Sequence, residues 1–116
     1  MSTIDPGKIF SDVIAAANAA VSGDITKMGG YAEAKLRAMA KQASMIGTYY
    51  ASKLIDDSDL PHFLDGLEDM ATSFLRTLVG LIRIQIEKAW NAIVGVLWGA
   101  IEAATGGVLQ LAKPGA

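Results

Sequence analysis

The C-terminal half of the chain carries an apolar repeat that strongly constrains how it can fold. Apolar residues recur there at alternating gaps of four and three, the spacing of a helical packing seam. The seam comprises Leu75, Val79, Ile82, Ile86, Ala89, Ile93, Val96 and Ala100. A second apolar stripe beside it comprises Phe74, Leu78, Leu81, Trp90, Val94, Leu97 and Ile101. A helix that is apolar on two faces is expected to be covered by neighbours on two sides.

The rest of the chain also follows helical spacing, and no segment shows the sustained period-two alternation of a strand. The glycine pair 29–30 is the point at which a helix is most easily broken. The acidic stretch 56–59, followed by Pro61, is the clearest helix-start signal. We therefore expect a single all-α domain over residues 1–116. Its three main helices are predicted at about 5–22, 24–55 and 60–105, with a short C-terminal tail over 106–116.

The predicted third helix has a consequence for molecular size. At 1.5 Å per residue it would be roughly 69 Å long, whereas a compact chain of this length has a diameter of roughly 35 Å. Either the helix breaks, for which Gly80, Gly95 and Gly99 are the candidates, or the molecule is elongated and other copies cover its apolar stripes. We expect the elongated, oligomeric form. The alternative is a compact bundle with a kinked third helix.

The predicted oligomer interface follows this third helix. Gly95 and Gly99 are four residues apart and are followed by Ala103, a pattern that permits close helix approach. Trp90 and Trp98 are expected to be core and interface anchors, with an aromatic belt at a membrane surface as the alternative. The predicted interface residues are Leu75, Val79, Ile82, Ile86, Trp90, Ile93, Gly95, Val96, Leu97, Trp98 and Gly99.

Charged residues are sorted by segment although the whole chain has a net charge of only -2. Residues 25–55 hold five basic side chains and one acidic one, whereas residues 56–69 hold six acidic side chains and no Lys or Arg. The acidic segment of one subunit could dock on the second helix of the next, which would give a head-to-tail assembly its direction. The two segments could equally pair within one chain, or be ordinary solvated faces.

No residue pattern points to catalysis or to a cofactor. The absence of cysteine excludes a thiol nucleophile and any cysteine-ligated metal site. His62 and Asp65 lie three residues apart and could share a cation, but acidic residues are expected at a helix start in any case. The pI near 5.2 gives no basic footprint for nucleic acid. We expect no enzyme, no metal or cofactor site and no small-molecule substrate.

Neither an export signal nor a membrane span is predicted. The N-terminus lacks a positively charged region, and the longest uncharged run, 89–101, is shorter than the roughly 20 residues a spanning helix needs. These features favour the cytoplasm or the interior of an assembled particle such as a virion.

The mean hydropathy of +0.34 is high for a chain that is alone in water. The sequence therefore predicts a non-enzymatic, self-assembling structural subunit of a ring, tube, filament or virion, associating through the third helix. Its partners would be its own copies and other structural proteins of the same assembly. In composition it is similar to small coat or shell subunits of viral and pilus-like assemblies. The alternative is a membrane-active helical protein that forms pores, lyses membranes or lies at their surface.

Overall fold

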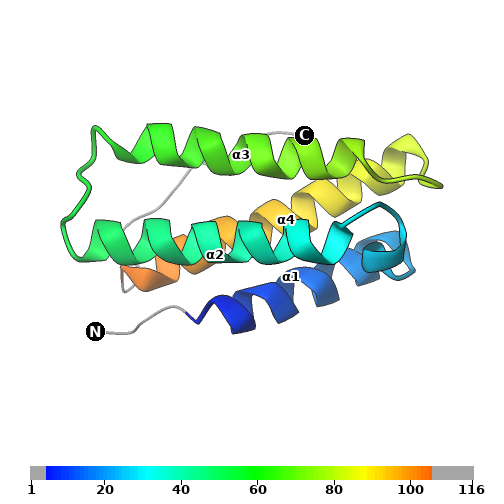
Figure 1. The fold of residues 1–116 in the computed structure, drawn as a ribbon, viewed down its shortest axis with the longest axis horizontal. Coiled ribbons are helices and arrows are strands. Elements are labelled where there is room, and N and C mark those ends of the chain that lie inside the picture. The colour runs from blue at the N-terminus through cyan, green and yellow to red at the C-terminus, as the bar shows by residue number, and fades with distance from the viewer. Residues whose placement is uncertain (1–4, 106–116) are drawn as a thin grey trace.

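The computed structural model describes residues 5–105, and within them the chain forms four α-helices that run alternately up and down (Figure 1). The helices are α1 (Pro6–Val21), α2 (Ala32–Ala51), α3 (Leu60–Arg76) and α4 (Arg83–Ala104), with a short 3-10 helix η1 (Ile25–Lys27) between the first two. The all-α fold class is confirmed in this part of the chain. The predicted tail over 106–116 lies outside the described residues.

The prediction of one helix over 60–105 is wrong. Residues 77–82 separate α3 from α4 and turn the chain back on itself. Gly80, one of the three candidate break points, has a φ of +83°, a left-handed conformation that favours glycine. Gly95 and Gly99 lie inside α4 and do not interrupt it. The apolar seam thus continues in the sequence across a turn between two helices.

The predicted helix over 24–55 is also divided, at the glycine pair. η1 ends at Lys27, and α2 begins only at Ala32. At this turn Gly29 lies against the α3–α4 connection, where an added Cβ would be 2.9 Å from the carbonyl oxygen of Thr77. Only glycine permits so close an approach.

The described residues form a compact bundle with a radius of gyration of 13.7 Å and extents of 42 × 24 × 21 Å. Helices α2 and α4 contact each other, and each of them also contacts α1 and α3. The longest described helix, α4, has 22 residues, so the size argument for an elongated molecule no longer applies. Both tryptophans are buried within the chain, Trp90 at 7% and Trp98 at 2% exposure. Self-association stays a prediction.

Candidate functional site

The end of the bundle at which α3 connects to α4 exposes three aliphatic side chains. Val79 is 71% exposed, Ile82 64% and Ile84 60%. We refer to these three residues as the apolar end, which lies on the right of Figure 1. Large apolar residues grouped within one short exposed segment are typical of interaction sites.

The connection that carries the apolar end is held by hydrogen bonds on both sides. The Val79 backbone N–H donates to the carbonyl oxygen of Met28 at 2.7 Å. The Gln85 side chain accepts a hydrogen bond from the Ile82 backbone N–H at 3.0 Å and donates to the Val21 carbonyl oxygen at 3.4 Å. These bonds tie the connection to the α1–α2 region. Because this backbone is already ordered in the free chain, the connection would lose little conformational entropy when a partner binds to it.

Basic side chains flank the apolar end. Residues 76–88 contain Arg76, Arg83 and Lys88 against one acid, Glu87, which gives this segment a net charge of +2. The Arg83 side chain is 91% exposed and lies 3.4 Å from the Glu87 carboxylate. A partner that covers the aliphatic group would therefore also meet a positive surface.

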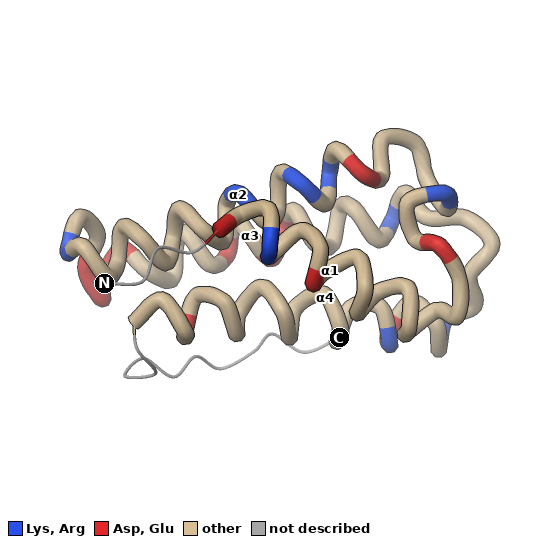
Figure 2. The backbone as a smooth tube through the Cα atoms, turned by 90° about the horizontal axis from the view of Figure 1, so that it is seen from below, with Lys and Arg blue, Asp and Glu red and all other residues tan. Residues whose placement is uncertain are grey.

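The opposite end of the bundle is acidic. Here the connection between α2 and α3 exposes Asp56, Asp57 and Asp59 together with Leu54, which is 72% exposed. Lys53 is the only basic residue of this connection, and residues 52–59 have a net charge of -2. We refer to Leu54, Asp56, Asp57 and Asp59 as the acidic end, marked by the red segments near the α2–α3 connection in Figure 2.

Hydrogen bonds fix the carboxylates of the acidic end. The Ser58 hydroxyl donates to Asp56 at 2.6 Å, and the Asp59 backbone N–H donates to the same carboxylate at 3.1 Å. These bonds lower the pKa of Asp56 below its ordinary value of 3.8 and keep it charged. The Tyr50 hydroxyl donates to Asp57, and this bond raises the pKa of Tyr50.

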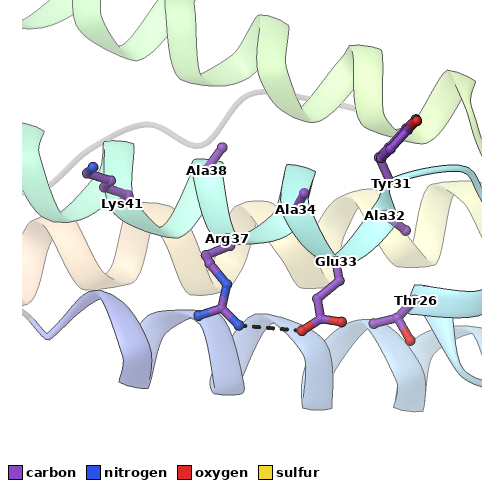
Figure 3. Close-up of a pocket in the computed structure, with 8 residues that line it drawn as sticks. All are labelled: Thr26, Tyr31, Ala32, Glu33, Ala34, Arg37, Ala38 and Lys41. Carbon is purple, nitrogen blue, oxygen red and sulfur yellow. Dashed lines mark hydrogen bonds and ion pairs between the residues drawn. The ribbon is translucent and has the colours of Figure 1, made fainter.

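The groove along α2 in Figure 3 is an open depression of about 640 Å³ lined by three alanines and by the polar side chains of Thr26, Tyr31, Glu33, Arg37 and Lys41. Its Arg37 side chain is already engaged: it lies 3.4 Å from the Glu33 carboxylate and 4.1 Å from the centre of the Phe10 ring. A guanidinium held in this way stabilises the contact between α1 and α2. The groove is therefore a wide, open surface whose guanidinium already has partners within the chain.

The predicted interface residues do not share one surface. Leu75, Trp90, Ile93, Leu97 and Trp98 are buried inside this chain. Their side chains are covered almost entirely by other helices of the same bundle, although Leu75 and Trp90 still reach the floor of a surface groove.

The other predicted interface residues reach the surface to different extents. Val79 and Ile82 are exposed at the apolar end, as described above. Ile86 lies with Leu75 and Trp90 in an apolar groove of about 340 Å³ between α3 and α4. A further groove of about 580 Å³ beside α1 is lined in part by Gly95, Val96 and Gly99. A Cβ added at either of these glycines would meet no atom within 4 Å, so no other helix of the bundle packs closely there.

Two exposed aliphatic residues escaped the sequence analysis. Ile84 belongs to neither apolar stripe. The sequence feature that could have identified it as exposed is its position directly after the charged Arg83, outside both stripes. Leu54 falls within the predicted helix over 24–55, but α2 ends at Ala51 and leaves Leu54 in a connection.

His62 is exposed, and in residues 5–105 no group of three or more His, Asp or Glu side chains is arranged to hold a metal ion. None of the helices within that range combines the length and apolarity required to cross a bilayer. Comparison with protein-family models, curated proteins and solved structures finds no match for this chain.

Proposed function

We propose that this protein is a structural subunit that associates with further copies of itself through its apolar end. The observation that carries the proposal is the exposure of Val79 and Ile82 on a connection held in place by hydrogen bonds, together with that of Ile84 in the first turn of α4. The chain buries both tryptophans yet exposes these three side chains, and such an ordered apolar surface supports binding of a protein partner. Rings, tubes, filaments and virions are the kinds of structure that such a subunit would build, with or without other structural proteins.

The strength of this contact is bounded by its size. Covering each of the three side chains would contribute about 1–2 kcal/mol. The sum, about 5 kcal/mol, only matches the low end of the roughly 4–15 kcal/mol that association costs in lost freedom of motion. Association through these residues alone is therefore weak. It requires a high local concentration of the subunit.

Sedimentation velocity over a series of protein concentrations tests the proposal. We expect the average mass of the wild-type chain to rise with concentration, and a Val79→Ser, Ile82→Ser variant to remain monomeric. Met45→Ser is the matched control, because Met45 is an exposed apolar residue in the middle of α2. A wild-type chain that stays monomeric throughout would overturn the proposal.

A membrane surface is the second candidate partner of the apolar end. Arg76 and Arg83 beside exposed aliphatic side chains suit attachment to an anionic bilayer without crossing it. Flotation with vesicles that contain phosphatidylserine separates this function from self-assembly. Binding that is lost in the Val79→Ser, Ile82→Ser variant would support attachment, and absence of wild-type binding would dismiss it.

A further inference from the structure

The apolar end and the acidic end lie at opposite ends of the long axis of the molecule. Because successive helices run in opposite directions, the α2–α3 connection and the α3–α4 connection are separated by the full length of α3 (Figure 1). The described part of the chain measures 42 Å along this axis. A single copy therefore cannot bring its own two ends together.

The two ends are chemically complementary. Each presents exposed aliphatic surface, Leu54 at one end and Val79, Ile82 and Ile84 at the other. The α2–α3 connection, residues 52–59, carries a net charge of -2. Residues 76–88, which comprise the α3–α4 connection and the adjoining helical residues that bear its charges, carry +2.

The charges at the acidic end are also unpaired within the described chain. No Lys, Arg or His there lies within 4.0 Å of the carboxylates of Asp56, Asp57 or Asp59. Opposite charges on two apolar patches favour one relative orientation of the partners and speed their encounter.

We propose that the occupant of the apolar end is the acidic end of a second copy, so that subunits join end to end in one direction. This inference rests on the proposed function and specifies the partner surface. Two apolar ends facing each other would instead bring the Arg76 and Arg83 side chains of both copies together, which like-charge repulsion opposes. Contact between different surfaces does not close on itself unless the rotation per subunit forms a ring.

The dimensions of the ends fit such a contact. A cross-section of 24 × 21 Å lets two ends bury roughly 1,000 Å² in total, the lower limit for a specific interface. The chain of subunits would have a repeat close to the 42 Å length of the described bundle. Because part of the attraction is electrostatic and exposed, added salt should shorten the assemblies.

The experiment uses two variants of the full chain, each with substitutions that disable one of the two ends. The apolar-end variant is Val79→Ser with Ile82→Ser, and the acidic-end variant is Leu54→Ser with Asp57→Asn and Asp59→Asn. The asparagines keep the acceptor oxygens that receive hydrogen bonds from Tyr50 and from the Asp56 backbone N–H, so the connection retains its local structure. Circular dichroism verifies that both variants fold.

We expect each variant alone to sediment as a monomer. An equimolar mixture should give a species of twice the monomer mass that does not grow, because one intact apolar end meets one intact acidic end. The control for charge is Asp65→Asn with Asp69→Asn. It also removes two negative charges, but from exposed positions on α3, and it should assemble like the wild type.

The outcomes separate this inference from the proposed function. If the acidic-end variant alone assembles like the wild type, or if the mixture stays monomeric, the end-to-end contact is overturned while self-association stands. If the wild-type chain is itself monomeric, the proposed self-association is wrong, and the end-to-end contact is wrong with it.

Discussion

Two apolar segments in the C-terminal half of the chain differ sharply in exposure. Between residues 89 and 101 of α4, the large apolar side chains Trp90, Ile93, Leu97 and Trp98 are buried by other helices of the chain. Between residues 78 and 84, Val79, Ile82 and Ile84 are mostly exposed. Both segments have the hydrophobicity of a core. Apolar spacing therefore identifies which side chains need cover, but it does not tell whether the cover comes from the same chain.

The difference between the segments is one of neighbours. Helix α4 contacts α1, α2 and α3, and these helices supply the cover for residues 89–101. The connection at 77–82 lies at the end of the bundle, where it is bound to the α1–α2 region through Met28 and lies against Gly29. Exposed aliphatic side chains at that position contribute little to the stability of the isolated chain. The free energy gained by burying these side chains can instead stabilise a complex with a partner.

The largest effect is expected in the buried segment. Trp98→Ala should lower the free energy of unfolding by about 3–5 kcal/mol, because it leaves a cavity among α4 and its neighbours. Urea denaturation followed by circular dichroism measures the change. The more conservative Trp98→Phe should cost clearly less. A loss below about 1 kcal/mol for the alanine variant would show that the packing around Trp98 is loose.

A smaller effect is expected where the exposed connection is anchored. Gly29→Ala would place a Cβ 2.9 Å from the Thr77 carbonyl oxygen and should cost about 1–3 kcal/mol of unfolding free energy as the backbones separate. Gly30→Ala is the matched control, because a Cβ at Gly30 meets no atom within 4 Å. Equal stability of the two variants in urea denaturation would contradict the close approach of the two connections.

The position of the α3–α4 break shows where sequence reasoning stops. Residues 77–82 keep the seam spacing and contain one glycine and no proline, so nothing local demands a turn. The turn depends on distant partners: Val79 bonds to Met28, and Thr77 lies against Gly29. Contacts of this kind cannot be predicted from helical spacing, whereas the helix start near Leu60 followed from the acidic stretch 56–59 and Pro61.

The candidate site was predictable to a similar, limited extent. Val79 and Ile82 were identified as interface residues because they lie on the seam, but the same seam also included Ile93, which is fully buried. By their spacing alone, Val79 and Ile93 are equally good candidates for the interface. Only the bundle geometry separates them, since Ile93 lies in the middle of α4 and Val79 lies outside it.

The smallest effect on folding is expected for Ile84→Ser. Because Ile84 is 60% exposed in the first turn of α4, the free energy of unfolding of the monomer should change by less than about 0.5 kcal/mol. The same substitution at fully buried Ile93, nine residues later in the same helix, should cost several times more. Ile84→Ser should nevertheless weaken self-association in sedimentation velocity, because its side chain belongs to the apolar end. If Ile84→Ser destabilised the monomer as much as Ile93→Ser, residue 84 would be part of the core, and the contrast between the two segments would be lost.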